Sequence, residues 1–518
     1  MKSGSVLPIR PTPPPLGPSD LLRRTLHKVR AGVEDTVARV LGVASVAVGG
    51  PNAAFWTPLL NKAGGELDVA QVPATWILGS IPPELRGRFF RNGPGQYEVA
   101  GDVNHHAFDG DGMIAAFTFA ASGVSFRNRY VHTSGFLAEQ AAGKRTAPAF
   151  GTPLPGGALV NAGRLPKNAA NTNVVMHGNR LLALFEGGRP HVLDPVTLRT
   201  LGEESYGGKV SFFSAHPHTG PDGATYNFGL APGPFPSAKV WRLDNSDRVT
   251  QVGNIRLAEH ALIHDFFKTA NHTILFEPPY YVPKSKLPGI LGGTNTMGYA
   301  YEWHPEQPLR AHVLDRHGNQ RTIHLPAEFL FHTVNAYEDS SGNLVCDYLG
   351  SPDNRAAEAW KQLPQGRPSV DGSCALRRVV LRPDGSYTQR TLSPLQGEFA
   401  RINPNYAGRE YRYGYATKMD ATDFVSTKIV KFDVNTGTVK EHDFGPGMLA
   451  AEPVFVPKPG AVAEDDGWLL TMVFDKNTNT SALAIVSAKD GEFGVSTQAW
   501  VRLPINIPLG FHGDFAPT

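Results

Sequence analysis

The stretch Ile429-Val-Lys-Phe-Asp-Val-Asn-Thr-Gly437 is an alternating apolar run that ends in a turn sequence. Alternation of apolar and polar residues is typical of a β-strand with one buried face, and Asp, Asn and Gly supply the backbone conformations of a tight turn. Four similar turn sequences follow apolar runs elsewhere: Asp194-Pro195-Val-Thr, Asp244-Asn-Ser-Asp247, Pro383-Asp384-Gly385 and Lys489-Asp490-Gly491. The pattern predicts a succession of β-hairpins.

Short apolar runs separated by turns continue from about Leu67 to the end of the chain. The 518 residues include 55 Gly and 43 Pro, which supply turn chemistry for many short strands. The runs fall into groups of roughly fifty residues without a strict sequence repeat. We therefore expect an all-β protein in which residues 61–518 form one seven-bladed β-propeller domain, with a cap of loops and short helices on one face. A β-sandwich or two smaller barrels is the alternative.

Residues 1–60 form an N-terminal leader of different character. Its first 19 residues contain Lys2, Arg10 and several Ser and Pro residues but no acidic residue, which is typical of a targeting segment and equally of a disordered Pro-rich leader. Apolar residues then recur at helical spacing within residues 19–48, so we expect an amphipathic helix that binds a membrane surface, belongs to a transit peptide or packs against the main body. A transit peptide over residues 1–45 would direct the protein to a plastid; otherwise we expect it in the cytoplasm.

Bulk composition excludes several classes of function. The formal net charge of +2 gives no electrostatic basis for binding nucleic acid. Cys346 and Cys374 are too few for a disulfide framework, which fits a reducing compartment. No apolar run approaches the roughly 18 residues that a membrane-spanning helix needs. We expect a soluble or peripheral membrane protein.

Four histidines stand at the edges of apolar, β-rich runs: His216, His264, His332 and His512. Successive members are 48, 68 and 180 residues apart, so no local finger or helix contains them. On the axis of a closed fold they could bind one metal ion and leave coordination positions open for chemistry. Each could instead be an ordinary surface or core histidine, since the chain contains 18.

Three glutamates lie in apolar surroundings where a solvated carboxylate is not expected: Glu186, Glu398 and Glu452. Such carboxylates commonly accept the imidazole N–H that points away from a bound metal, although a strand-end cap or a salt bridge would also explain them. Imidazole ligands suit Fe, Zn, Cu and Ni, so the ligand type leaves the metal open. The sequence contains no HExxH, GxSxG, P-loop or GxGxxG helix start, which removes the common hydrolase, kinase and dinucleotide-binding functions.

From about Asp68 to Phe515 the chain resembles the carotenoid oxygenase family, the non-haem iron(II) enzymes that cleave conjugated double bonds in carotenoids, apocarotenoids and stilbenes. The segments that carry the resemblance are Phe90-Arg-Asn-Gly-Pro-Gly-Gln96, His106-Ala-Phe-Asp-Gly-Asp-Gly-Met113, Asn171-Thr-Asn-Val174, Ala183-Leu-Phe-Glu-Gly-Gly188, Glu452-Pro-Val-Phe-Val456 and Ala463-Glu-Asp-Asp-Gly-Trp-Leu469.

The resemblance implies a fold, a cofactor and roles for named residues. It implies a seven-bladed propeller with Fe(2+) on its axis, an apolar tunnel to the iron, and an apolar polyene and dioxygen as reactants, without an organic cofactor. The implied iron ligands are the four histidines, and the implied partners of those ligands are the three glutamates. Thr172 matches the residue whose methyl group crowds one open iron position in some relatives.

Three stretches are similar to the apocarotenoid-cleaving branch of the family: Asn128–Phe136, Leu165–Asn173 and Ala258–Phe266. This branch implies cleavage of an apocarotenal at its central 15,15′ bond to give retinal. Stilbene cleavers carry a phenolate-binding lysine near the position of Gly135, a role that a neighbour such as Lys144 could take. Cleavage of a phenolic stilbene, of a carotenoid at another bond, hydrolase or isomerase chemistry on the same scaffold, and a binding propeller without activity are the alternatives.

A polyene substrate is almost insoluble in water, so the enzyme is expected to collect it from a membrane or a lipid droplet. Residues 279–291 combine apolar side chains with Lys284 and Lys286, a composition typical of a membrane-facing loop. A loop folded over the main body is the alternative.

Overall fold

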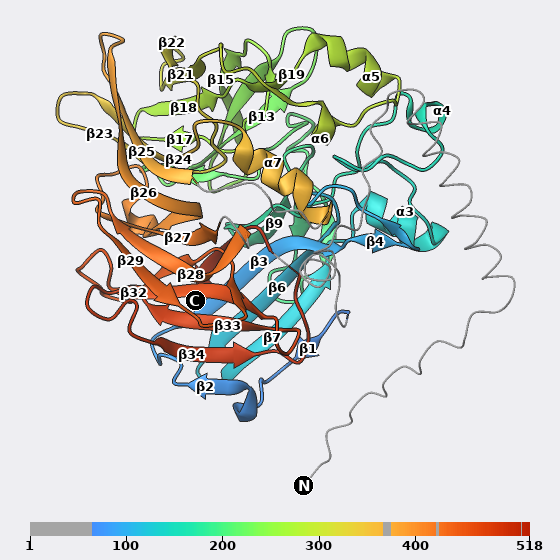
Figure 1. Cartoon of the computed structure of the whole chain (residues 1–518). Coiled ribbons are helices and arrows are strands. Elements are labelled where there is room, and N and C mark those ends of the chain that lie inside the picture. The colour runs from blue at the N-terminus through green and yellow to red at the C-terminus, as the bar shows by residue number, and fades with distance from the viewer. Residues whose placement is uncertain (1–64, 366–373, 421–423, 509) are drawn as a thin grey trace, which may run out of the picture.

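Figure 1 shows the computed structural model of the chain, which describes residues 65–365, 374–420, 424–508 and 510–518. This part of the chain is nearly all β-structure, and all its paired strands are antiparallel. The predicted leader of residues 1–60, with its transit peptide over 1–45 and its helix over 19–48, lies outside the described residues.

The strands form separate sheets in the order of the chain. The first has the strand order β1 (Asp68–Val69), β7 (Gly123–Tyr130), β6 (Asp111–Ala120), β3 (Gly87–Gln96) and β35 (Gly513–Pro517). The second has β11 (Thr200–Glu203), β10 (His191–Leu193), β9 (Arg180–Leu184) and β8 (Asn173–His177). The third has β12 (His218–Thr219), β13 (Thr225–Ala231), β14 (Ser237–Leu243) and β15 (Val249–Arg256).

The next sheets continue this arrangement. The fourth has β17 (Phe267–Lys268), β18 (His272–Glu277), β21 (Leu309–Asp315) and β22 (Gln320–Leu325). A seven-stranded sheet has β23 (Thr333–Glu338), β24 (Leu344–Gly350), β25 (Cys374–Leu381), β26 (Tyr387–Ile402), β27 (Tyr413–Asp420), β28 (Phe424–Asp433) and β29 (Val439–Asp443). The last large sheet has β2 (Ile77–Gly79), β34 (Thr497–Arg502), β33 (Thr480–Ser487), β32 (Gly467–Asp475) and β30 (Met448–Ala450), and β31 (Val454–Pro457) also pairs with β32.

Two small sheets complete the set of strands. They contain β16 (His260–Ala261), β19 (Tyr280–Val282) and β20 (Glu302–Trp303), and β4 (Glu98–Val99) with β5 (Asp102–Val103).

The predicted hairpins are confirmed. The turn after Asp433 joins β28 to β29, with the Gly437 N–H donating to the Asp433 carbonyl at 2.8 Å. Gly437 has φ of 74°, and a Cβ there would lie 2.5 Å from the Leu392 carbonyl oxygen, so glycine is required on both counts. The other four turn sequences connect β10 to β11, β14 to β15, β25 to β26 and β33 to β34.

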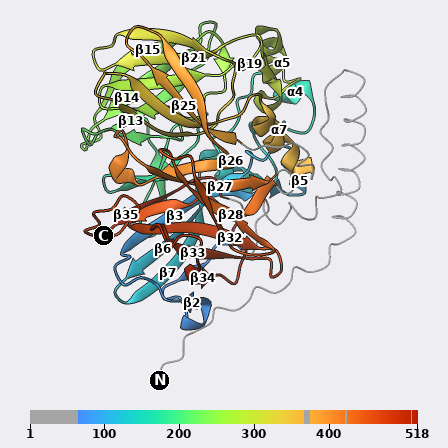
Figure 2. The ribbon, with the colours of Figure 1, turned by 60° about the vertical axis from the view of Figure 1, so that its left-hand side comes forward.

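Apolar side chains pack between successive sheets in a closed cycle. Phe90 of the first sheet packs in one cluster with Val174 of the second, and the following sheets contact one another in chain order. Two further clusters join the two halves of the seven-stranded sheet and connect it to the last sheet. The cycle closes where Phe117 of the first sheet packs with Leu470 of the last. Figures 1 and 2 both show the first sheet beside the last.

Strands from both ends of the described chain also form hydrogen bonds in the first and the last large sheet. The C-terminal strand β35 pairs with β3 near the start, and the early strand β2 pairs with β34 near the end. Each of these two sheets therefore contains strands from both ends of the sequence, which makes the closure a matter of backbone pairing as well as apolar packing.

The helices are short. They are α3 (Ser134–Ala142), α4 (Ala158–Asn161), α5 (Leu287–Leu291), α6 (Met297–Ala300), α7 (Arg355–Gln362) and the 3₁₀ turns η1 (Ala74–Trp76), η2 (Lys284–Lys286), η3 (Leu363–Gln365) and η4 (Pro404–Tyr406). The Thr133 hydroxyl caps α3 by accepting the Phe136 N–H, and Gly143 ends it in the left-handed conformation. Helices α4, α5 and α7 gather on one side of the molecule in Figure 2. In the described part, no helix has the length and apolar character to cross a bilayer.

Candidate metal centre

The four predicted histidines lie shortly before strands of four different sheets. His332 and His512 directly precede β23 and β35, His216 lies two residues before β12, and His264 lies three residues before β17. Each of these four strands is an edge strand of its sheet. The fold therefore brings the start of one edge strand from each of these four sheets to a common point.

Their imidazoles meet there. The Nε2 atom of His264 lies 2.8 Å from Nε2 of His216 and 3.2 Å from Nε2 of His332, and Nε2 of His332 lies 3.1 Å from Nε2 of His512. All four potential ligand atoms lie within 4.8 Å of one another. The structure thus brings the four predicted histidines together, and their role as metal ligands stays a prediction.

The three predicted glutamates contact three of these imidazoles on the opposite ring nitrogen. Glu186 contacts His264 Nδ1, Glu398 contacts His332 Nδ1, and Glu452 Oε1 lies 2.8 Å from His512 Nδ1. A carboxylate only accepts hydrogen bonds, so each Nδ1 carries the proton and each Nε2 presents a lone pair to the cluster. Converging lone pairs repel one another unless a cation lies between them.

The glutamates do not all lie in strands. Glu398 belongs to β26, whereas Glu186 is in the turn that follows β9 and Glu452 is in the link between β30 and β31. Their side chains also differ in exposure, at 29% for Glu186, 3% for Glu398 and 1% for Glu452. The three imidazole–carboxylate pairs are therefore not equivalent.

A break in the register of β26 aims several side chains at the centre. The pairing with β27 shifts between Glu398 and Arg401, and Phe399 has φ of 59°, an uncommon conformation for a bulky residue. The Phe399 N–H donates to Glu398 Oε2 at 2.9 Å. The distortion lets Glu398 reach His332 while the adjacent Phe399 ring contacts the same histidine, with centroids 5.1 Å apart.

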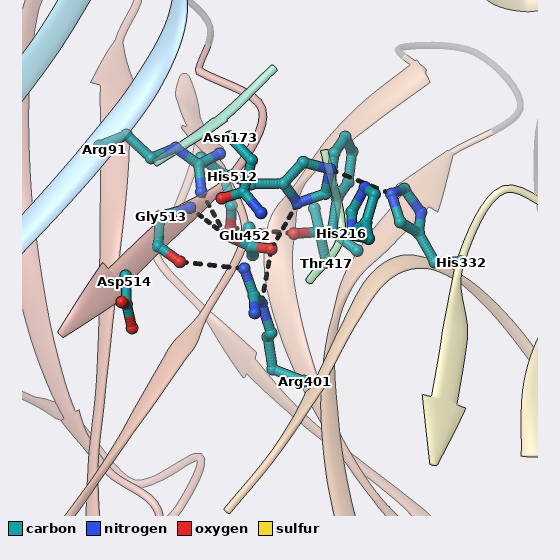
Figure 3. Close-up of polar contacts among 12 residues, drawn as sticks. Arg91, Asn173, His216, His332, Arg401, Thr417, Glu452, His512, Gly513 and Asp514 are labelled. Carbon is teal, nitrogen blue, oxygen red and sulfur yellow. Dashed lines mark hydrogen bonds and ion pairs between the residues drawn. The ribbon is translucent and has the colours of Figure 1, made fainter. Parts of the chain in front are cut away.

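Glu452 is held by two arginines that sequence reasoning did not single out (Figure 3). Arg91 Nη1 donates to Glu452 Oε2 at 2.8 Å, and Arg401 Nε donates to Oε1 at 2.7 Å. The Gly513 N–H also donates to Oε2, at 2.9 Å. Arg91 lies within the Phe90–Gln96 motif, and Arg401 lies three residues after Glu398. Both arginines are therefore close in sequence to residues with a predicted role.

Asp265 was also missed, and it ties three of the histidine-bearing segments together. Its Oδ1 lies 2.8 Å from His218 Nε2, and its Oδ2 accepts the Thr333 hydroxyl at 2.7 Å and the Thr333 N–H at 2.9 Å. Burial alone would raise the pKa of Asp265, but His216 and His218 together with these hydrogen bonds hold it well below its ordinary value. Asp265 is therefore a buried carboxylate whose hydrogen bonds hold the starts of β12 and β23 in place.

The electrostatics favour neutral imidazoles at two positions. Burial, reinforced by the neighbouring imidazoles, lowers the pKa of His216 and of His512 well below the usual value. At His264 burial acts in the same direction, but the Glu186 carboxylate outweighs it and the pKa is raised. Neutral imidazole is the form that binds a metal.

Thr172 immediately precedes β8. Its hydroxyl lies 3.1 Å from Asn171 Oδ1, and its neighbour Asn173 donates to the Ala215 carbonyl beside His216 at 2.7 Å. Within the described part of the chain, Thr172 forms no hydrogen bond with the four histidines. Its predicted role at an open metal position stays a prediction.

An aromatic cluster packs against the centre. Its members contact one another and the imidazoles at ring-centroid distances between 5.1 and 6.2 Å, and they are Phe108, Phe331, Trp360, Phe399 and Phe511. Phe331 lies against His264, and Phe399 lies against His332 and His512. Trp360 belongs to α7, so the helical side of the molecule contributes to this apolar wall.

The donor set fits a divalent metal. Metal–imidazole bonds of about 2.1 Å at right angles separate two nitrogens by about 3 Å, which agrees with the Nε2 separations of 2.8, 3.2 and 3.1 Å. The four imidazoles are neutral donors, and the carboxylates around them offset the charge of a dication. The arrangement can hold one metal ion with coordination positions left for reactants.

The chain is similar to several known proteins. The model of the family described as retinal pigment epithelial membrane protein matches residues 61–517. The apocarotenoid-15,15′-oxygenase of Synechocystis is 34% identical over 470 residues, which cover 85% of this chain and 92% of that protein. The resveratrol cleavage oxygenase 1 of Aspergillus fumigatus is 29% identical over 87% of this chain and 93% of its own length.

Two further matches complete the comparison. The carotenoid 9,10(9′,10′)-cleavage dioxygenase 1 of Pisum sativum is 30% identical over 85% of this chain and 86% of that protein. The solved structure of the cobalt-substituted Synechocystis enzyme superposes with a TM-score of 0.80 at 32% identity and covers 90% of this chain and 99% of that one.

Proposed function

We propose a reaction from the premise that the chain belongs to the carotenoid oxygenase family, the family of the retinal pigment epithelial membrane protein, and is an oxygenase. The reaction is the oxidative cleavage of a conjugated double bond of an apocarotenoid by dioxygen, to give two carbonyl products. The observation that carries the proposal is the cluster of four imidazoles, three of which have their outer nitrogen held by a carboxylate.

The metal in this proposal is Fe(2+). His216, His264, His332 and His512 would hold it, and bound ferrous iron would supply the one-electron chemistry that activates dioxygen. Glu186, Glu398 and Glu452 keep the Nδ1 protons of their histidines in place, which fixes both the tautomer and the direction of each Nε2 lone pair.

The aromatic cluster supports a polyene as the substrate. Its rings form an apolar wall beside the imidazoles, which suits a conjugated chain and excludes bulk water from the reacting bond. Thr172, immediately before β8, would restrict one open position of the metal through its methyl group. Each of these residues acts by position rather than by chemical reaction.

Cleavage at the 15,15′ bond of an apocarotenal, with retinal as a product, is the form of the reaction that we favour. It rests on the similarity to the Synechocystis apocarotenoid-15,15′-oxygenase. A stilbene substrate is less well supported because no free lysine stands at Gly135. A Cβ at Gly135 would lie 3.0 Å from Lys167 Cβ, and the Lys167 ammonium pairs with Asp111 at 2.8 Å and with Glu139 at 2.6 Å. Lys144 is exposed beyond the end of α3.

We also propose that the sheets are the seven blades of a propeller with the metal on its axis. The first, second, third, fourth and last large sheets give five blades, and the seven-stranded sheet gives two that share the long strand β26. The closed cycle of apolar clusters between successive sheets supports this arrangement. So does the position of the four histidines, each just before an edge strand.

A membrane-facing surface is the last part of the proposal. The predicted loop 279–291 includes α5, and its end contacts the α4 segment through the Gly163 N–H and the Leu291 carbonyl. Three leucines of these neighbouring segments are exposed, at 97% for Leu159, 81% for Leu165 and 68% for Leu291. Arg164, which precedes Leu165, and Lys284 of the loop are also exposed, and such cations suit an anionic lipid surface.

The plastid targeting by residues 1–45 stays a prediction, which a fluorescent fusion of those residues tests.

The experiment that tests the reaction is aerobic incubation of the Fe(2+)-loaded protein with an apocarotenal in detergent, followed by chromatography of the aldehydes. Retinal as the main product supports cleavage at the 15,15′ bond, and other aldehydes place the cleavage at another bond. Resveratrol run in parallel tests the stilbene alternative. Iron-loaded protein that cleaves none of these substrates overturns the proposal in favour of a binding role, and His264→Ala is the metal-free control.

A further inference from the structure

The three imidazole–carboxylate pairs differ in how their negative charge is compensated. Glu452 receives four N–H donors, and two of them come from the cationic side chains of Arg91 and Arg401. Among the described residues, Glu186 and Glu398 form no ion pair with a lysine or arginine. Glu398 instead accepts the Phe399 N–H and the Cys374 thiol.

The cationic donors act on the same carboxylate that holds His512 (Figure 3). Arg401 Nε and His512 Nδ1 both donate to Glu452 Oε1, at 2.7 and 2.8 Å. The two N–H groups therefore compete for the electron density of one oxygen. A carboxylate oxygen that already accepts a hydrogen bond from a guanidinium attracts the imidazole proton less strongly. His512 is therefore a weaker electron donor to the metal than it would be beside a carboxylate without the guanidinium.

We propose that Arg401, together with Arg91, is a positioning residue that sets the reduction potential of the metal through Glu452 and His512. The two guanidinium charges weaken His512 as a donor and lie close to the centre, and both effects disfavour the more highly charged ferric state. They therefore hold the iron in the ferrous form. This inference rests on the iron proposed above.

The local charges make the effect large enough to measure. Arg91 and Glu452 are almost fully buried, so their interaction is little screened by solvent. Burial lowers the pKa of Arg91 to about 10, which leaves it charged at neutral pH. The other acidic groups near Arg401 are Asp514 and Asp265, of which Asp514 has a pKa raised by burial. Glu452 is thus the carboxylate that Arg401 contacts directly.

Arg401 is the better residue to change. Its side chain is 32% exposed, whereas that of Arg91 is 2% exposed, so its loss leaves a smaller buried defect. Arg401→Gln removes the charge, and Arg401→Lys keeps the charge while it loses the fork geometry. Arg378→Gln is the matched control, because Arg378 forms an equally close pair with Asp347 on β24, outside the contacts of the centre.

The experiment is an anaerobic redox titration of the iron-loaded full chain, with the iron content measured beside it. We expect a lower midpoint potential and a larger ferric fraction by electron paramagnetic resonance for Arg401→Gln, partial recovery for Arg401→Lys, and the parent value for Arg378→Gln. Glu452→Gln removes a negative charge instead, so we expect it to raise the midpoint potential. This second variant decides the test if Arg401→Gln retains too little iron for a titration.

The outcomes separate this inference from the proposed function. A parent protein that binds no iron removes the proposed function. A parent that binds iron, with unchanged potentials in both Arg401→Gln and Glu452→Gln, removes the role of the arginines and leaves the proposed function intact. An equal shift in Arg378→Gln also removes that role, because it would show a general response to a lost buried ion pair.

Discussion

The Nε2 atoms of His216 and His264 lie 2.8 Å apart, although the residues belong to segments that lead into different sheets. His264 carries its proton on Nδ1, toward Glu186, so its Nε2 lone pair points into the cluster. Without a shared cation, such an approach of imidazole lone pairs would be repulsive. The pair therefore marks the place where the proposed metal would lie.

Loss of a histidine from this pair should abolish metal retention. Removal of an outer partner alone typically lowers metal affinity by about 10- to 100-fold, and we expect His264→Ala to lose more than that. Elemental analysis of the purified protein measures this, with the exposed His324→Ala as the matched control. A His264→Ala protein with full metal content and full activity would exclude this residue from the site.

The carboxylates should matter in proportion to their burial. Glu398→Gln keeps an acceptor oxygen but removes the charge from a nearly buried side chain, so we expect metal affinity to fall by about 10- to 100-fold. Glu186→Gln should cost less, because the Glu186 side chain is 29% exposed and water can replace its interaction. Metal titrations with a competing chelator compare the two variants, and equal losses would contradict the ranking.

Membrane binding should depend on the exposed leucines rather than on the whole loop. Leu287 and Ile290 are only partly exposed, so the informative changes are Leu159→Asp and Leu291→Asp, which place charges in the proposed surface. We expect at least a severalfold loss of binding to liposomes in flotation assays, since each buried leucine side chain contributes about 1.5–3 kcal/mol. Val495→Asp, at a 75% exposed site between β33 and β34, is the control. Unchanged flotation of both leucine variants would remove this surface from the membrane contact.

The stability of the protein should carry a pH dependence from Asp109. Burial raises the pKa of this carboxyl from 3.8 to about 6, while the Thr152 hydroxyl and the Gly151 N–H oppose the shift. A raised native pKa means that the native state binds the proton more tightly, so the contribution is fully present below pH 3.8 and is lost as the pH rises through about 6. The shift corresponds to a change on the order of 3 kcal/mol.

Asp109→Asn removes this titration while it keeps the size of the side chain. We expect the melting temperature of the variant, measured relative to that of the parent, to increase as the pH rises from about 4 to about 6. Calorimetry of both proteins across this range measures the difference. A melting-temperature difference that is constant with pH would show that Asp109 does not titrate there.

Much of the local structure could be predicted because it depends on neighbours in the sequence. The five turn sequences carry their own backbone conformations, as Gly437 shows, and each joins a pair of adjacent strands. The four histidines and three glutamates could be chosen because imidazole and carboxylate groups are unusual at the ends of apolar runs. Their family resemblance then assigned a common role, and the structure brings them together.

Other parts of the site had no sequence signal that could be interpreted. Alternation along β26 would place Glu398 and Phe399 on opposite faces, but the shifted register and the positive φ of Phe399 direct both toward His332. Arg91 and Arg401 lie 310 residues apart and meet at one carboxylate, so neither could be assigned a partner before the sheets were placed. The exposure of Leu159 and Leu291 likewise depends on where α4 and α5 pack.

The sequence by itself determined the β-rich character, the hairpins and the set of groups able to bind a metal, because strand alternation, turn conformation and ligand chemistry are properties of single residues and their near neighbours. Tertiary structure alone decided which atoms meet. The apolar clusters join the last sheet to the first, and this closed packing sets the 2.8 Å approach of His216 to His264 and the sharing of Glu452 between His512 and two arginines. Such contacts arise from the summed geometry of all the sheets, so no local stretch of sequence contains them.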